Sequence, residues 1–228
     1  MPFDFALGTR HNELNIAMLY PLFVDIQDKR CVIVGAGAVA ERRVKSLVSH
    51  GAVVVVIGPS ATPNLSAMAE AKRISWKQAD YEPSQLNDAF LVIAATDNAA
   101  VNAAVSEEAN RRNQLVCCVD DPSAGNYLTA ASVERGGIII ALTTSGASPT
   151  LTSIIKTRLE NQFGPEWEHW AALFSTIRTS IQSLPTEHAR REAVEQILND
   201  NFIIEQVAFG ELDRAEEAAK QCISSLSA

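Results

Sequence analysis

A glycine-rich turn is the first place in this chain where residue types and spacing could do chemistry. The apolar residues Cys31–Val34 lead directly into Gly35-Ala36-Gly37-Ala38-Val39-Ala40, and a helical pattern follows. In such a turn Gly35 would allow the tight bend, Gly37 would let the backbone approach phosphate groups closely, and the small Ala40 would let the helix pack on the strand. The helix N-terminus would add unpaired N–H groups and a partial positive charge. The pattern predicts a dinucleotide site, and a plain structural turn is the alternative.

Asp120 is the candidate for proton transfer. It follows the predicted strand Leu115–Val119, so it would face the crevice at the carboxyl edge of a parallel sheet, where ligands bind. Other catalytic patterns are missing from the sequence. No tyrosine has a lysine four residues later, the four histidines form no metal-binding pair, and neither a nucleophile elbow nor a lysine-containing phosphate loop occurs. An aspartate that starts a turn with Pro122 is the alternative interpretation.

The end of the second predicted strand leaves the identity of the cofactor open. Dinucleotide sites of this type usually carry an acidic residue about 20 positions after the glycines, where it binds the adenosine ribose. Here the strand ends in Ile57-Gly58-Pro59-Ser60, without a carboxylate. These residues are compatible with NADP, with Arg42 or Arg43 near its phosphate, and with NAD held by backbone groups and Ser60.

Thr96 and Asp97 follow the fourth predicted strand, at the same edge of the sheet. Polar side chains at this position would lie where ligands bind in open α/β sheets. A helix cap is an equally good interpretation from the residues alone.

Apolar runs alternate with helical patterns from residue 30 to residue 120. Continuous Val and Ile runs suit strands buried on both faces, so we expect a doubly wound, Rossmann-type parallel sheet flanked by helices. The expected strands are Cys31–Val34, Ala52–Ile57, Ile74–Gln78, Phe90–Ala95 and Leu115–Val119.

The sequence pattern changes after residue 121. Tyr127–Val133 and Ile138–Leu142 are predicted to form a pair of strands. Ser148 and Pro149 suit an N-cap and a first helical position, and helical patterns continue to the end of the chain, with two stretches expected after Pro185. The α/β domain is therefore expected to be followed by a small strand-rich segment and a helical C-terminal region.

Composition narrows the class of protein. The chain has 228 residues, 47% of them hydrophobic, and a net charge of −8, which argues against nucleic-acid binding because Lys and Arg are not in surplus. No secretory signal is visible, and no apolar run is long enough to span a membrane. The four cysteines form neither a disulfide framework nor a CxxC metal pattern. We expect a cytoplasmic protein without a resident metal.

The order and spacing of these motifs resemble the precorrin-2 dehydrogenase family of siroheme synthesis, which includes the N-terminal half of bacterial siroheme synthase. The matching segments are Leu19–Phe23, Val34–Arg43, Ala94–Asp97, Val119-Asp120 and Thr144–Pro149, followed by a helix with Lys156 and Arg158. Together they span residues 18–163. Residues 1–17 look like an extension ahead of the family start. We therefore divide the chain into this extension, an NAD-binding Rossmann domain over residues 18–121, dimerisation strands over 122–147 and a helical region over 148–228.

The resemblance implies that NAD⁺ accepts hydride from precorrin-2 to give sirohydrochlorin, and that Fe²⁺ is then inserted as a chelatase substrate, as in many relatives. Family members are similar in forming homodimers through the strands and the C-terminal helices. Asp120 matches the family's essential aspartate, a general acid/base in both steps. Thr144 stands where some relatives have a phosphorylated serine. The positions that would contact NAD are Ala38, Val39, Pro59 and Ser60, which favours NAD over NADP.

A tetrapyrrole substrate of this kind carries carboxylates around its rim, so an acidic protein needs a local basic cluster to bind it. The candidates are Arg42, Arg43, Arg135, Lys156 and Arg158, of which we favour Lys156 and Arg158, with Ser145 and Gly146 as further substrate contacts. Two rival hypotheses stay open. A non-enzymatic NAD-sensing domain would share the glycine turn but would not need Asp120, and a dehydrogenase without chelatase activity would carry the same residues.

Overall fold

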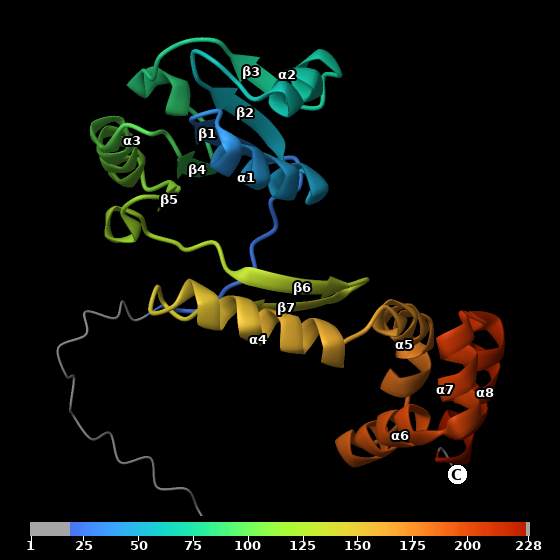
Figure 1. The fold of residues 1–228 in the computed structure, drawn as a ribbon. Helices are drawn as coiled ribbons and strands as arrows, with labels where there is room; N and C mark the ends of the chain where they lie inside the picture. Colours follow the sequence, from blue (N-terminus) through green and yellow to red (C-terminus); the bar gives the residue numbers. More distant parts are fainter. Residues whose placement is uncertain (1–18, 227–228) are drawn as a thin grey trace, which may run out of the picture. The chain divides into compact units, whose positions relative to one another are not determined.

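The computed structural model describes residues 19–226 and divides into two compact units, one ending at Thr129 and one beginning at Ala130 (Figure 1). The first unit holds a five-stranded sheet in the order β3-β2-β1-β4-β5, with every neighbouring pair parallel. Its strands are β1 (Arg30–Val34), β2 (Val53–Ile57), β3 (Ser75–Lys77), β4 (Leu91–Ala94) and β5 (Leu115–Cys118). The predicted Rossmann-type sheet is confirmed.

Burial on both faces explains why these residues form a parallel sheet. Alternate side chains of one strand enter separate cores, since Ile33 packs in one cluster while Val32 and Val34 pack in the other. All three side chains are nearly inaccessible to water. A strand buried in this way needs apolar residues at every position, which is why its sequence lacks the alternation of a half-exposed strand.

Two of the three helices that follow strands in the first unit begin at a residue whose side chain caps them. Its helices are α1 (Ala38–Ser49), α2 (Pro63–Glu70) and α3 (Ala99–Arg111), with short 3-10 turns η1 (Pro83–Leu86) and η2 (Pro122–Ala124). The Thr62 hydroxyl caps α2, and the Asn98 side chain accepts hydrogen bonds from two backbone N–H groups at the start of α3. Ala40 is fully buried against the sheet, as its small size predicts.

The second unit contains a two-stranded antiparallel sheet and helices. Its elements are β6 (Ala131–Arg135), β7 (Ile138–Leu142), α4 (Pro149–Gln162), α5 (Glu166–Gln182), α6 (Glu187–Asn199), α7 (Asn201–Phe209) and α8 (Leu212–Ser225). The Ser148 hydroxyl caps α4 by accepting a hydrogen bond from the backbone N–H of Leu151, with Pro149 at the first helical position. The predicted strand pair and helical region are confirmed. No helix within residues 19–226 is long and apolar enough to cross a membrane.

Two details of the second half differ from expectation. The strand expected from Tyr127 starts only at Ala131, because the backbone N–H groups of Asn126 and Tyr127 both bond to the carbonyl of Val116 and so follow β5 instead. Three helices, rather than two, follow Pro185. Asp200 ends α6 and its carboxylate also caps α7, so the break occurs without glycine or proline.

The turn after β1 depends on a close approach that only glycine permits. Gly35 has φ of +109°, and a Cβ on it would lie 2.2 Å from the carbonyl oxygen of Ala95, which follows β4. Its N–H donates to the carbonyl of Ile57 at 2.8 Å, on the opposite side of β1. The turn is therefore fixed between both neighbouring strands.

We predict that Gly35→Ala lowers the free energy of unfolding by about 1–3 kcal/mol, because the new methyl group meets backbone that cannot move aside. Gly37→Ala is the matched control two residues away. A Cβ there meets nothing within 4 Å, so the loss should be about 1 kcal/mol or less. Urea denaturation of both variants checks this, and equal losses would show that the close approach carries no stability.

Candidate functional site

A pocket of about 710 Å³ lies at the carboxyl edge of the sheet in the first unit. It brings together six predicted cofactor contacts, namely Gly35, Gly37, Pro59, Ser60, Thr96 and Asp97. The other two, Ala38 and Val39, are the first residues of α1 and are not among the residues that line the pocket. Because β1 lies between β2 and β4, the pocket sits at the switch point where ligands bind in doubly wound sheets.

The residues at the start of α1 fit a dinucleotide. Gly37 is the N-cap, so it has no side chain that could accept a hydrogen bond from the first-turn N–H groups of α1. Gly37 is exposed, with open space where a side chain would stand. Free N–H groups beside open space are what a pyrophosphate requires.

The loop between β2 and α2 is held to α1 on the β2 side of the pocket. Glu41 in the first turn of α1 accepts hydrogen bonds from the Thr62 hydroxyl at 2.6 Å and from the Asn64 amide at 2.8 Å, and it pairs with Lys45 at 2.6 Å. The bonds from Lys45, Thr62 and Asn64 lower the pKa of Glu41 to about 2. Glu41 therefore stays ionised and keeps the pocket-lining Thr62 in place.

Asp80 and Tyr81 line the same pocket, although the sequence analysis did not select them. They lie three and four residues beyond the end of β3. The Tyr81 hydroxyl is buried and has no hydrogen-bond partner within the described part of the chain. Burial raises the pKa of Tyr81, and the nearby Glu108 carboxylate raises it further. Neither residue belongs to a motif, so only the three-dimensional neighbourhood of β2 and β3 could have revealed them.

Asp120 follows β5 and is exposed, as its predicted position requires. The Cys118 thiol donates a hydrogen bond to the Asp120 carboxylate at 3.1 Å. This bond lowers the pKa of Asp120, and a hydrogen bond from the Asn102 side chain lowers it further. Asp120 is therefore ionised at neutral pH, which is the form of a carboxyl group that can accept a proton.

Asn102 joins Asp120 to the pocket. Its side chain is buried, and its Oδ1 accepts hydrogen bonds from the Thr96 hydroxyl at 2.7 Å and the Thr96 backbone N–H at 3.0 Å. Its Nδ2 donates to the Thr96 carbonyl at 3.1 Å. Asn98, rather than Thr96 or Asp97, caps α3. Thr96 and Asp120, which follow neighbouring strands, are thus held by one amide that the sequence analysis did not select.

The predicted substrate contacts belong to the second unit. Ser145 and Gly146 form a loop in which both residues have positive φ, +51° and +84°. Lys156 and Arg158 lie on α4, where Lys156 pairs with Glu160 at 3.7 Å. Arg135, an unfavoured alternative, donates from Nε to the carbonyls of Phe163 and Gly164 just beyond α4. Its guanidinium therefore already has partners.

The thiols and acids form no metal site in the part of the chain that the structure describes. No group of three His, Cys, Asp or Glu side chains within residues 19–226 could hold a metal ion. The four cysteines are all free, and Cys31, Cys117 and Cys118 are buried.

Comparisons with known proteins identify relatives of this chain. Residues 22–131 match a family model described as "Putative NAD(P)-binding". Precorrin-2 dehydrogenase of Bacillus subtilis is 40% identical over 134 residues, which cover 59% of this chain and 82% of the relative. Siroheme synthase of Sodalis glossinidius is 34% identical over 206 residues, which cover 90% of this chain and 44% of the relative. The chain thus spans less than half the length of the siroheme synthases it matches.

A solved structure has the same fold. The structure titled "SirC, precorrin-2 dehydrogenase" superposes with a TM-score of 0.70, covers 91% of this chain and 100% of its own, and shares 24% sequence identity.

We predict that Gly37→Asp weakens dinucleotide binding by at least about 100-fold, because its carboxylate would stand against a pyrophosphate. The fold should survive, since the site of the new side chain is open and Asp is among the best N-cap residues. Calorimetric titration with NAD⁺, beside a melting curve, checks both parts. Full affinity in Gly37→Asp would mean that the cofactor binds elsewhere.

Proposed function

This chain belongs to the precorrin-2 dehydrogenase family, and from that premise we propose that it oxidises precorrin-2 to sirohydrochlorin with NAD⁺. The observation that carries the proposal is the arrangement at the sheet edge. A pocket that fits a dinucleotide and an ionised carboxylate, Asp120, are joined there through Asn102 and Thr96. A dehydrogenase needs both a cofactor site and a proton acceptor, whereas a domain that only senses NAD needs the first alone.

The oxidation removes a hydride and a proton from the substrate. Bound NAD⁺ supplies the hydride acceptor. Asp120 takes the proton, because it is an ionised, exposed carboxylate that follows β5 at the carboxyl edge of the sheet. Cys118 and Asn102 orient the carboxylate, so that it does not have to be ordered at the moment of reaction.

Insertion of Fe²⁺ into sirohydrochlorin is the second proposed step, with the metal as a substrate. Two pyrrole N–H protons must leave before the ring nitrogens can hold the ion, and the exposed Asp120 is proposed to accept them one at a time and to release each to solvent. The names of the siroheme synthase relatives support this step. A dehydrogenase without chelatase activity is the alternative, and the two differ only in what the chain does with added metal.

The second unit is proposed to bind the substrate's carboxylates. Arg158 is exposed on α4, and Lys156 on the same helix is half-buried. The left-handed backbone at Ser145 is uncommon for a residue with a side chain and is found where a loop is held for binding. Ser145 and Gly146 are proposed to contact the same carboxylate groups.

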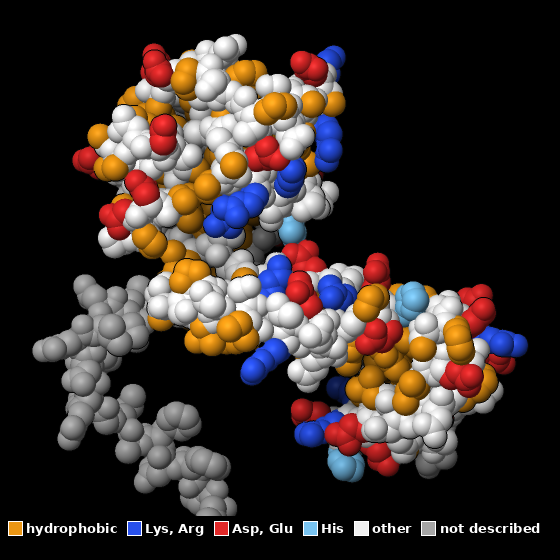
Figure 2. Space-filling view, in the orientation of Figure 1, with side chains coloured by type: hydrophobic (Ala, Val, Ile, Leu, Met, Phe, Trp, Pro, Cys, Tyr) orange, Lys and Arg blue, Asp and Glu red, His pale blue; other side chains and the backbone are white. Residues whose placement is uncertain are grey.

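We propose a homodimer, because the strand pair of the second unit lacks enough cover of its own. A two-stranded sheet is marginally stable alone. Ile139 on β7 is 44% exposed, Leu151 and Ile154 on α4 are 47% and 48% exposed, and α4 has no fully buried residue. Figure 2 shows apolar side chains at the surface over α4. A second copy of this chain would cover them.

Light scattering at micromolar concentration should give twice the mass of one chain. Ile154→Lys should shift this mass toward the monomer, since it places a charge in the apolar surface. A monomer mass for the unmodified chain would reject the dimer.

The central test of the function is Asp120→Asn under anaerobic conditions. We predict that NAD⁺ binding survives while precorrin-2 oxidation, followed as NADH formation, falls by about two to four powers of ten. Asp121→Asn is the matched control. Among the described residues, that neighbouring carboxylate bonds to Ser123 at the start of η2, so activity should persist.

The same two variants test the second step when sirohydrochlorin and Fe²⁺ are supplied. Loss of metal insertion in Asp120→Asn would support one shared base. Metal insertion by Asp120→Asn at the normal rate would contradict the shared base. If this variant also oxidised precorrin-2 normally, Asp120 would have no catalytic role and would be a turn residue.

A further inference from the structure

We propose that Asp80 supplies the carboxylate missing from the end of β2, and that it makes the pocket select NAD over NADP. The inference rests on the proposed function only in taking the pocket as a dinucleotide site. Strand β2 is followed by Gly58, Pro59 and Ser60, none of which can bind ribose hydroxyls as an acid does. Asp80 lines the same pocket from the loop after β3.

Hydrogen bonds connect the residues that follow β2 with the end of β3. We infer that they bring Asp80 close to the place where the acid after β2 usually lies. The backbone N–H of Gly58 donates to the carbonyl of Lys77 at 3.1 Å, and the indole N–H of Trp76 donates to the carbonyl of Gly58 at 3.0 Å. The Gln78 amide then donates to the carbonyl of Pro59 at 3.2 Å. These bonds hold the start of the Asp80 loop beside the end of β2.

The other end of the loop is fixed by η1. The Gln85 side chain donates to the Asp80 carbonyl at 3.3 Å and accepts from the backbone N–H of Glu82 at 2.8 Å. Arg30 at the start of β1 donates to the Gln85 carbonyl at 2.9 Å. The exposed Asp80 carboxylate is therefore carried on a loop with little freedom to move away.

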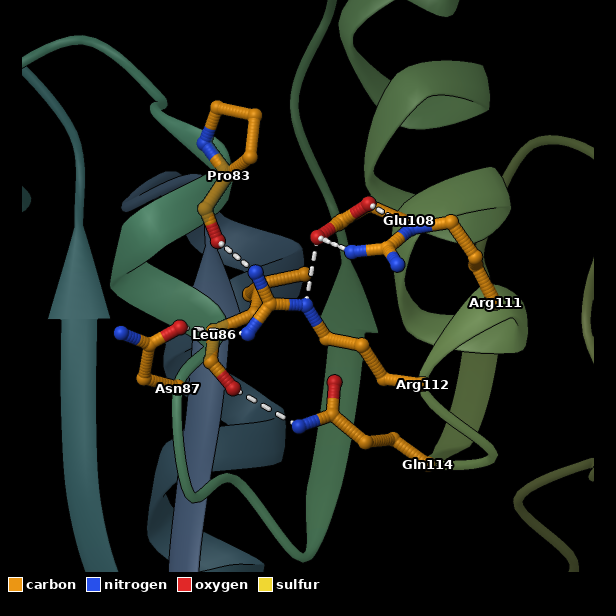
Figure 3. A network of polar contacts seen from close by, with 7 residues as sticks. All are labelled: Pro83, Leu86, Asn87, Glu108, Arg111, Arg112 and Gln114. Atoms are coloured by element: carbon orange, nitrogen blue, oxygen red, sulfur yellow. Dashed lines mark hydrogen bonds and ion pairs between the residues drawn. The ribbon is translucent and has the colours of Figure 1, made fainter.

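Helix α3 holds η1 from its other side (Figure 3). Arg112 donates to the carbonyl of Pro83 and to the Asn87 side chain, while Gln114 donates to the carbonyl of Leu86 at 2.7 Å. Glu108 pairs with Arg112 and Arg111, and these bonds lower the pKa of Glu108 to about 2. The guanidinium of Arg112 is thus engaged in this network.

The charge of the pocket opposes a phosphate on the ribose. Among the residues that line it, the charged side chains are two carboxylates, Asp80 and Asp97. Neither Arg42 nor Arg43 is among those lining residues. Arg43 instead lies near Tyr127, where its positive charge opposes the rise in the pKa of Tyr127 that burial causes. The 2′-phosphate of NADP would meet Asp80 without a cation to balance it, whereas the free ribose hydroxyls of NAD can donate hydrogen bonds to this carboxylate.

Calorimetric titration of the full chain with NAD⁺ and with NADP⁺ tests this assignment through affinity, without turnover. We expect the unmodified chain to bind NAD⁺ more tightly. Asp80→Asn should lower the ratio of the NADP⁺ dissociation constant to the NAD⁺ dissociation constant by about tenfold. The effect is modest because the carboxylate is exposed and screened. Asp80→Arg should tighten NADP⁺ binding further.

Asp97→Asn is the matched control, since it removes the pocket's other carboxylate, which follows β4 on the far side of β1. Because Asp97 is itself a predicted cofactor contact, its loss should change both affinities to a similar extent and leave their ratio within about twofold. An unchanged ratio in both Asp80 variants, or a shift as large in Asp97→Asn, would overturn the role of Asp80 while leaving the dinucleotide site intact. If the unmodified chain bound neither dinucleotide, the proposed function would fail first, and this inference with it.

Discussion

The contact between Gly35 and the backbone of Ala95 is the constraint on which the site depends. The Ala95 carbonyl lies where a side chain of Gly35 would stand, and the N–H of Ala95 donates to the carbonyl of Val34 at 2.8 Å. The ends of β1 and β4 are therefore as close as their backbones allow. The chain continues from Gly35 into α1 and from Ala95 into the segment that begins at Thr96. Gly35, Ala95 and Thr96 all line the pocket, so this contact fixes two of its sides relative to each other.

A buried amide extends this edge to β5. Asn102 is 1% exposed on α3, where a buried polar group is costly unless it is fully bonded. It meets that requirement by bonding to Thr96 at three atoms and to Asp120. The same bonds that satisfy Asn102 hold the carboxylate on which the proposed proton transfer depends, so local stability and chemistry rely on one side chain.

The fold was predictable because its signals are local. Apolar runs such as Val53–Ile57 and the turn after Val34 carry their residue types next to one another in the chain. The site was predictable only in part. Asp120 and Thr96 follow predicted strands, so the sequence places both at the carboxyl edge of the sheet. Their assigned roles stay predictions. Asp80 and Asn102 gain their importance from contacts across strands and helices, which a single sequence does not reveal.

The errors have the same origin. The apolar stretch after Tyr127 suits a strand, but its backbone bonds to Val116 decide otherwise. The break at Asp200 was missed because an aspartate that caps one helix while ending another leaves no glycine or proline to mark it. In both places a bond to a particular partner overrode the local pattern.

We propose that one sheet edge holds the dinucleotide and presents it to Asp120. A crystal structure of the chain with NAD⁺ tests this most directly. It should show the pyrophosphate hydrogen-bonded to the first-turn N–H groups of α1 above Gly37, with the adenosine ribose toward Asp80 and the nicotinamide on the side of Thr96 and Asp120. A dinucleotide bound away from the first turn of α1, or with its nicotinamide directed away from Asp120, would contradict the account.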